Sequence, residues 1–204
     1  MFMRPLPLGF IAPCLPTASP KPPRGSAWVH EIKHDGYRLM ARREGSRIRL
    51  FTRHGYDWSK RYPLIVDALA SFRVNSIIID GEAVWCSKDG RTDFDKLHSH
   101  AFDDEVILYG FDLLEVNGED YRAYPLEKRK AKLEKILART QEIRFSEHLD
   151  GDGETIFHHA CKMWLEGIVS KRRDFPYRSG RCKSWIKVKS PESAAVLRIQ
   201  DGSW

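Results

Sequence analysis

A lysine in a short charged segment is the group best placed for chemistry in this sequence. Lys33 lies in Glu31-Ile32-Lys33-His34-Asp35-Gly36-Tyr37-Arg38, where an alternating apolar and polar pattern ends in a sharp Asp-Gly turn. An amine attacks only after it has lost its proton, and partial burial or a neighbouring cation favours that loss. Lys33 is therefore a candidate nucleophile, with Gly36 as a position of close approach or positive φ. The alternative is a solvated lysine beside a turn, because Lys-X-Asp-Gly alone is a short pattern.

Two further pairs of charged residues have side chains of the types that bind phosphate oxygens or a divalent cation. Lys187 and Lys189 stand two apart in an expected strand, so both ammonium groups point to one face and can neutralise phosphate oxygens. A basic strand edge that discourages aggregation is the alternative. Glu82 and Glu166 are candidate ligands of Mg²⁺, which prefers one or two carboxylates together with phosphate oxygens and water.

Strands and helices that would position these residues can be read from the hydrophobic pattern. Strands are expected at residues 28–33, 37–43, 47–52, 77–85, 106–116, 167–171 and 184–189. Helices are expected at residues 59–72, with Ser59 as N-cap, and at 126–139 and 153–165. Turns are expected at residues 44–46, 87–90 and 117–118, and Asp80 is interpreted as a turn residue that interrupts its strand. Because strands and helices do not alternate regularly, the sequence predicts an α+β fold of antiparallel sheets flanked by helices.

Length and composition indicate a globular protein without a membrane span. The 204 residues are 42% hydrophobic and 30% charged, and no apolar run reaches the roughly 18 residues that a membrane helix requires. The pattern of prolines divides the chain into a Pro-rich arm (1–27), a main domain (28–190) and a C-terminal tail (191–204). Scattered cysteines and the lack of a signal-peptide pattern favour a cytoplasmic protein.

The net charge of +6 favours an anionic partner, although a solvated surface gives the same count. A basic stretch with interleaved aromatic residues, expected as a loop at 172–183, is typical of chains that follow a phosphate backbone. A charged, solvated loop is the alternative for this stretch.

Several segments in a fixed order resemble the covalent nucleotidyltransferase superfamily, which contains ATP-dependent DNA ligases, RNA ligases and capping enzymes. They are Lys33-His34-Asp35-Gly36, Thr52-Arg53-His54-Gly55, Asp80-Gly81-Glu82, Tyr109-Gly110-Phe111-Asp112-Leu113-Leu114, Glu166-Gly167-Ile168-Val169-Ser170-Lys171 and Trp185-Ile186-Lys187-Val188-Lys189. The resemblance covers residues 28–189 and is strongest to the adenylation domain of bacterial DNA ligases of the end-joining type. It implies an ATP-grasp-like nucleotidyltransferase fold.

The resemblance also implies a reaction and a set of contacts. Lys33 would attack the α-phosphorus of ATP and form a phosphoramide, with ATP and Mg²⁺ as cofactors. The implied ATP contacts are Glu31, Arg38, Glu82, Phe111, Lys171, Lys187 and Lys189. Among these, Glu82 would also reach the ribose, Phe111 would stack on adenine, and Glu82 and Glu166 would hold the metal. Arg53 would contact the phosphates of a nick. A surface ion pair is the alternative for Glu31, Arg38 and Lys171, and a core position is the alternative for Phe111.

The implied function is that of an ATP-dependent DNA ligase, or its adenylation module, that transfers AMP to a 5′-phosphate at a nick in DNA repair. Family ligases continue into an OB-fold domain, and the residues between Lys189 and Trp204 are too few for one. The expected partners are therefore nicked double-stranded DNA and a separate OB-fold or end-joining protein, with the chain itself a monomer. A nucleotidyltransferase acting on RNA and a non-catalytic protein that binds nicks or ends are the alternatives.

Overall fold

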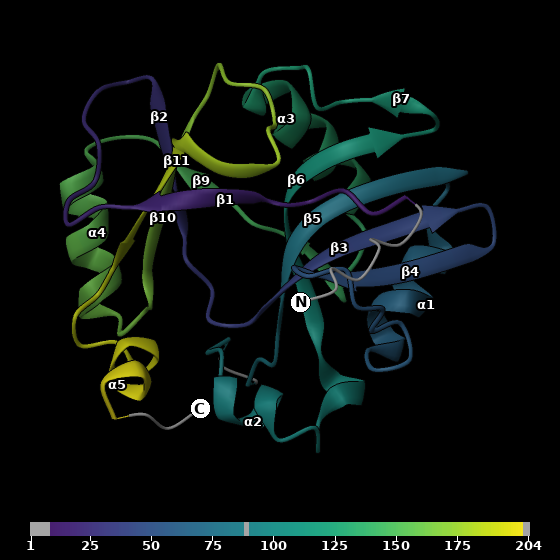
Figure 1. The fold of residues 1–204 in the computed structure, drawn as a ribbon, viewed down its shortest axis with the longest axis horizontal. Helices are drawn as coiled ribbons and strands as arrows, with labels where there is room; N and C mark the ends of the chain where they lie inside the picture. The colour runs from purple at the N-terminus through teal and green to yellow at the C-terminus, as the bar shows by residue number, and fades with distance from the viewer. Residues whose placement is uncertain (1–8, 88–89, 202–204) are drawn as a thin grey trace, which may run out of the picture.

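Two twisted β-sheets form the centre of the structure, a computed structural model that describes residues 9–87 and 90–201 (Figure 1). The first sheet has the strand order β1 (Cys14–Ala18), β11 (Gly180–Lys189), β10 (Gly167–Arg172), β2 (Trp28–Ile32) and β9 (His148–Leu149). The second has the order β4 (Arg47–Thr52), β3 (Tyr37–Glu44), β5 (Ser76–Val84), β6 (Ile107–Val116) and β7 (Glu119–Asp120), with β8 (Ile143–Phe145) also paired to β6.

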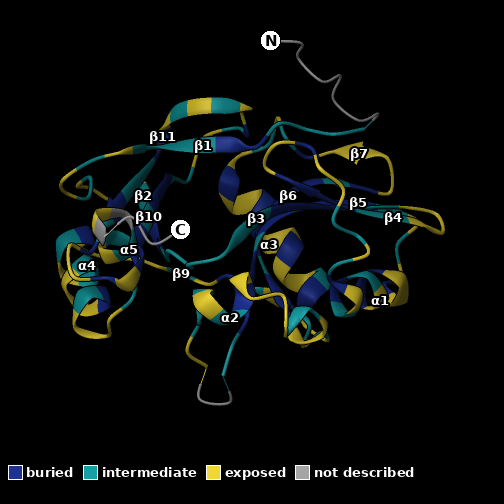
Figure 2. Cartoon of the chain, turned by 60° about the horizontal axis from the view of Figure 1, so that its bottom comes forward, coloured by how far each residue is buried: buried dark blue, intermediate teal, exposed yellow. Residues whose placement is uncertain are grey.

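Helices flank both sheets. They are α1 (Pro63–Ser71), α2 (Phe94–His98), the short 3-10 helix η1 (Asp103–Glu105), α3 (Leu126–Leu137), α4 (Gly153–Lys162) and α5 (Ala194–Asp201). In Figure 2, α1 and α3 lie under the second sheet, and α4 and α5 lie under the first. Only the β1–β11 and β6–β8 pairs are parallel among the described strands. This arrangement confirms the predicted α+β fold. None of the helices in the described part of the chain is long and apolar enough to cross a membrane.

The largest hydrophobic core lies between the second sheet and the helices α1 and α3. Leu39, Leu50 and Ile79 from the strands pack there with Ile65 of α1 and Leu133 of α3. A smaller cluster between the two sheets includes Phe111 and Trp185 and forms part of the cavity described below. The alternation of apolar residues along β3, β4, β5 and β6 thus provides both a core face and a face directed at the other sheet.

Two predicted turns are confirmed. The chain reverses between β3 and β4 at residues 45 and 46, as the Glu44-Gly45-Ser46 pattern predicts. Asn117 and Gly118 join β6 to β7, with φ values of 51° and 82° that fit the mirror-image turns preferred in hairpins. For the expected turn at 87–90, residues 88 and 89 lie outside the described part of the chain.

Helix α1 begins later than predicted. It starts at Pro63, with Tyr62 as N-cap, because proline is well suited to the first helical turn and disfavours helical geometry in the residue before it. The predicted N-cap, Ser59, instead accepts a hydrogen bond from the Leu50 amide through its hydroxyl (3.0 Å). Helices α3 and α4 begin at the predicted residues and end slightly earlier.

The basic segment before the last strand is also more ordered than predicted. Strand β11 starts at Gly180, so the expected loop at 172–183 is reduced to a shorter connection from β10. The reason is β1, which pairs in parallel with β11 from Cys14 opposite Gly180 onward. The proposed N-terminal arm therefore includes β1, and the proposed C-terminal tail includes α5; residues 1–8 and 202–204 are outside the described part.

Candidate active site

A cavity of about 170 Å³ between the two sheets brings together most of the predicted site residues. Its lining includes Glu31, Lys33, Arg38, Arg53, Glu82, Phe111, Lys171 and Lys187. These residues come from β2, β3, β5, β6, β10 and β11 and from the segments that follow β2 and β4. The remaining two predicted residues, Glu166 and Lys189, are linked to the cavity through Lys33, as described next.

Lys33 is fixed at the end of β2 by its backbone and by an ion pair. Its amide donates to the Gly167 carbonyl (3.0 Å), which extends the β2–β10 pairing by one residue. Its ammonium group donates to a carboxylate oxygen of Glu166, and the other oxygen of that carboxylate pairs with Lys189 (3.0 Å). Glu166 is buried, whereas the Lys33 side chain is 21% exposed. The ammonium group is therefore held beside a carboxylate but stays accessible to a ligand.

Gly36 allows the loop after Lys33 to lie against the second sheet. A Cβ atom at this position would be 2.1 Å from the Ala83 carbonyl oxygen of β5. Any side chain would therefore push the loop away from the sheet. Of the two reasons that the sequence suggested for a glycine here, the structure supports close approach.

Glu31 lies in a buried network that the sequence revealed only in part. Its two carboxylate oxygens accept hydrogen bonds from Lys130 (2.8 Å) and Lys171 (2.7 Å). Burial acts to raise the pKa of Glu31, but the two ammonium groups outweigh it and the pKa is lowered. Burial lowers the pKa of Lys171 to about 8. The Lys171 ammonium also lies 4.3 Å from the centre of the Phe111 ring, so this network reaches the cavity wall.

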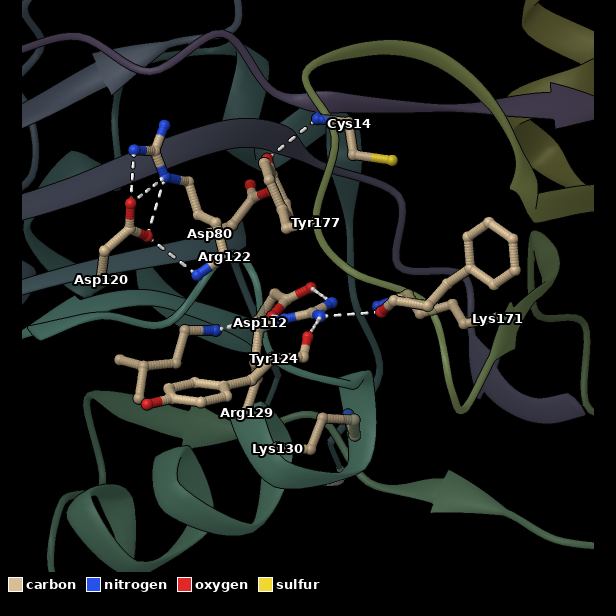
Figure 3. A network of polar contacts seen from close by, with 12 residues as sticks. Cys14, Asp80, Asp112, Asp120, Arg122, Tyr124, Arg129, Lys130, Lys171 and Tyr177 are labelled. Carbon is tan, nitrogen blue, oxygen red and sulfur yellow. Dashed lines mark hydrogen bonds and ion pairs between the residues drawn. The ribbon is translucent and has the colours of Figure 1, made fainter. Parts of the chain in front are cut away.

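Arg38 is held over Phe111 by Asp80, for which the sequence pattern had wrongly predicted a turn. The guanidinium makes two hydrogen bonds to Asp80 (2.5 and 2.7 Å), and its carbon is 4.5 Å from the Phe111 ring centre. Asp80 lies inside β5, fully buried, and is not a turn residue; the register of β5 against β6 shifts directly after it. The hydroxyl of Tyr177 donates to Asp80 (2.5 Å) and accepts from the Cys14 amide (2.8 Å; Figure 3).

A second buried ion pair supports Phe111 from the other side of β6. Asp112 and Arg129 form two hydrogen bonds (2.6 and 2.8 Å), and both side chains are fully buried (Figure 3). Arg129 also donates to the carbonyls of Tyr124 (2.6 Å) and Phe175 (2.9 Å). The pair therefore connects the strand that carries Phe111 to α3 and to the segment before β11.

Lys187 and Lys189 lie on one face of β11 but have different surroundings. Lys187 lines the cavity, where burial lowers its pKa and the nearby Lys33 and Lys189 lower it further. Lys189 pairs with Glu166 instead. Arg53 lies in the turn after β4, exposed at the edge of the cavity. His34, to which the sequence assigned no role, stacks on Tyr109 with ring centres 4.1 Å apart.

The carboxylates of the cavity fit a magnesium ion that is completed by phosphate oxygens and water. The described residues contain no group of three or more His, Cys, Asp or Glu side chains arranged to hold a metal by themselves. Glu82 faces the cavity, and no side-chain hydrogen bond or ion pair of its carboxylate is seen in the described part of the chain. Burial raises the pKa of Glu82 to about 7, even though Lys33 and Arg38 act to lower it. Such a carboxylate is available to a cation, and Mg²⁺ prefers sites of this kind.

The raised pKa of Glu82 predicts that this residue destabilises the fold when it is ionised. A carboxyl whose pKa is higher in the folded than in the unfolded chain binds its proton more tightly when folded, so stability falls as pH rises through the interval between the two values. Here that interval runs from about 4.5 to about 7. We expect the free energy of unfolding of Glu82→Gln, measured with urea, to exceed that of the wild type by about 2 kcal/mol at pH 8. At pH 4.5 the two proteins should differ little. An equal difference at both pH values would contradict the assigned cause.

Comparison with known proteins identifies the family. Residues 20–189 match the model of the ATP dependent DNA ligase domain. Over 186 residues the chain is 44% identical to the multifunctional non-homologous end joining protein LigD of Pseudomonas aeruginosa, covering 88% of this chain and 22% of that protein. It thus spans about a fifth of that relative's length.

Solved structures agree with this assignment. A mycobacterial DNA ligase D complexed with ATP and MES matches with a TM-score of 0.76 and 33% identity, over 87% of this chain and 60% of that one. The Chlorella virus DNA ligase-adenylate matches in fold alone, with a TM-score of 0.62 and 16% identity, over 89% of this chain and 69% of that one. The family match and the shared fold lead to one conclusion: the chain belongs to the ATP dependent DNA ligase domain family.

Proposed function

We propose that the chain is the adenylation module of an ATP-dependent DNA ligase, in which Lys33 receives AMP from ATP and passes it to a 5′-phosphate in DNA. One observation carries this proposal. A single cavity is lined by an aromatic ring, a lysine at a strand end and further cations, in Phe111, Lys33, Lys187 and Arg38. These are the groups that a nucleotide needs for its base, for covalent attachment and for its phosphates.

ATP would bind with its adenine against Phe111 and its phosphates toward Lys187 and Lys189. Glu31 and Lys171 would contact the base side of the nucleotide, Arg38 the ribose or phosphates, and Glu82 the ribose hydroxyls. The Glu31–Lys171 pair is satisfied within the protein and fully buried, so it fixes the depth of the pocket before any ligand enters. Glu82 and Glu166 would hold Mg²⁺, which supplies charge neutralisation at the phosphates when bound.

Attack by Lys33 requires that its ion pair with Glu166 break and that its nitrogen lose a proton. The bond between nitrogen and the α-phosphorus then forms, and the bond to the β-phosphate oxygen breaks, so pyrophosphate leaves. Lys189 already pairs with Glu166, so that carboxylate keeps a cationic partner when Lys33 releases it. This compensation lowers the cost of freeing the nucleophile, because a buried carboxylate without any partner is strongly unfavourable.

The second half of the proposal concerns DNA. The LigD relative is named for non-homologous end joining, and this supports a role in DNA repair with nicked double-stranded DNA as acceptor. A separate OB-fold or end-joining protein would complete the nick-sealing reaction. A cytoplasmic location and a monomeric state stay predictions.

The acceptor is tested with protein that already carries AMP. Mixed with a nicked duplex that has a labelled 5′-phosphate, it should give adenylated DNA on a denaturing gel, and sealed product when the OB-fold or end-joining protein is also present. Binding of the nick without any transfer of AMP would favour the non-catalytic alternative. A nicked RNA duplex that accepts AMP equally well would favour the RNA-directed one.

Arg53 provides a prediction for the DNA contact. Because it is an exposed arginine at the cavity edge, Arg53→Ala should weaken binding of the nicked duplex several-fold and reduce the slope of log affinity against log salt by about 1. Arg47→Ala removes an exposed arginine at the first residue of β4, the strand that Arg53 follows, and is the matched control. Fluorescence anisotropy over a series of salt concentrations measures both; equal effects of the two variants would contradict a specific contact by Arg53.

A further inference from the structure

Two cysteines from distant parts of the chain lie in contact at the edge of the first sheet. Cys14 belongs to β1 and Cys182 to β11, and these two strands pair in parallel. Their sulfur atoms are 2.7 Å apart and share a hydrogen bond, and both cysteines are in the reduced form. A disulfide bond is about 2.05 Å long, so the two sulfurs need to approach by less than an ångström to form one.

The two thiols differ in exposure and in acidity. Cys14 is buried, whereas Cys182 is partly exposed, so a small oxidant in solution reaches Cys182 first. The hydrogen bond from Cys14 lowers the pKa of Cys182 to about 6, and hydrogen bonds from Ser184 and the Trp185 amide act in the same direction. The contact with Cys182 and burial raise the pKa of Cys14. A partly exposed thiolate beside a second, protonated thiol is the arrangement of cysteines that undergo reversible oxidation.

The strand that carries Cys14 also forms part of the wall of the cavity between the two sheets. β1 lies at the edge of its sheet, with β11 as its neighbour, and Leu15 and Pro16 line the cavity. The Cys14 carbonyl accepts a hydrogen bond from Arg38 (3.2 Å), and its amide donates to the hydroxyl of Tyr177 (2.8 Å). A covalent bond between β1 and β11 would therefore fix this wall in the position that it has in the reduced protein.

We propose that Cys14 and Cys182 are a redox-active pair, which hydrogen peroxide converts to a reversible disulfide that fastens β1 to β11. This modification site is independent of AMP transfer by Lys33. It needs no partner protein, because both sulfurs belong to one chain and are already in contact.

The oxidation proceeds in two steps. The Cys182 thiolate attacks one oxygen of hydrogen peroxide, an S–O bond forms as the O–O bond breaks, and the leaving hydroxide takes up a proton to become water. The Cys14 sulfur then attacks the Cys182 sulfur, an S–S bond forms, and the S–O bond breaks. The proton of Cys14 leaves with that hydroxyl group as a second water. Both sulfurs are thus oxidised and the peroxide is reduced, and a thiol reductant reverses the change by exchange.

Peptide mapping of the full chain after peroxide treatment tests this proposal. Reduced protein, freed of reductant, is exposed to a small excess of hydrogen peroxide, its remaining thiols are alkylated, and it is digested without reduction. Mass spectrometry should find the peptide that contains Cys14 joined to the one that contains Cys182. The oxidised protein should melt roughly 5–15 °C higher, because the bond joins residues 168 positions apart and restricts the unfolded chain. Dithiothreitol should reverse both changes.

Serine variants assign the effect to this pair. Cys182→Ser should lose both the joined peptides and the rise in melting temperature, and its partly exposed position makes it the milder of the two possible changes. Cys14→Ser should lose them as well. The matched control is the double variant Cys86→Ser and Cys161→Ser, because these cysteines are partly exposed and lie outside β1 and β11. It should form the same bond as the wild type.

Other products of the oxidation would overturn the proposal. Conversion of Cys182 to a sulfinic acid without the bond to Cys14 would do so, as would a disulfide that involves Cys86, Cys161 or a second copy of the chain. A bond between Cys14 and Cys182 that left the melting temperature unchanged or lower would also overturn it, because β1 would then not be held more firmly. None of these measurements uses ATP, so their outcome is separate from that for AMP on Lys33.

Discussion

Replacing Lys33 by alanine is expected to abolish attachment of AMP to the protein and every later step that uses it, a loss on the order of 10⁴-fold or more in turnover. The other lysines that line the cavity between the two sheets cannot readily replace Lys33 as the nucleophile. Lys171 is buried and held by Glu31. Lys187 lies within β11, whereas Lys33 lies at the end of β2, where it pairs with Glu166. Covalent catalysis of this kind has no parallel route when its nucleophile is removed.

Formation of adenylated DNA from ATP and a nicked duplex measures this loss. Lys132→Ala is the matched control, because Lys132 is an exposed lysine of α3 at which alanine suits the helix. It should react like the wild type and have a similar melting temperature. Adenylated DNA in the Lys33→Ala reaction at even a few per cent of the wild-type rate would require a different nucleophile.

Replacing Arg129 by leucine is expected to lower the free energy of unfolding by about 3–5 kcal/mol. The substitution leaves the Asp112 carboxylate buried without its partner and also removes the donor to the carbonyls of Tyr124 and Phe175. An unpaired buried charge is among the few causes of so large a loss. Since Asp112 follows Phe111 in β6, the change should also weaken nucleotide binding in the protein that stays folded.

Urea unfolding of Arg129→Leu and Arg122→Leu compares a buried and an exposed ion pair. Arg122 pairs with Asp120 at the surface (2.7 Å), with half-exposed side chains, and its loss should cost less than about 1 kcal/mol. Similar losses of unfolding free energy in the two variants would show that burial does not determine how much the Asp112–Arg129 pair contributes to stability.

The sequence indicated which residues would lie together better than it indicated which contacts hold them in place. Lys33, Glu82, Phe111 and Lys187 stand in short patterns at strands or strand ends, and the two sheets bring these segments to one cavity. The resemblance of these patterns to one family implied that they would lie together. The seven strands that the sequence predicted were placed well, because each has an alternating or continuous apolar run bounded by turn residues. The strands β1, β7, β8 and β9 were not predicted.

The supporting contacts could not be predicted because each joins residues far apart in the chain. Lys130 meets Glu31 from α3, and Tyr177 meets Asp80 from the segment before β11. A partial signal was present for α3. Arg129 and Lys130 fall between Leu126 and Leu133, on the helix face that is otherwise apolar, and a cation there must be paired with a buried acid. Asp112 within the apolar run of β6 was the matching signal.

The most direct test of the account is to locate AMP on the protein itself. Wild-type protein incubated with ATP and Mg²⁺ is digested, and the peptide that has gained one AMP is sequenced by mass spectrometry. The account predicts a single modified residue, Lys33, with loss of the modification when pyrophosphate is added. AMP on Lys187 or another residue, or no covalent AMP under conditions in which ATP binds, would contradict it.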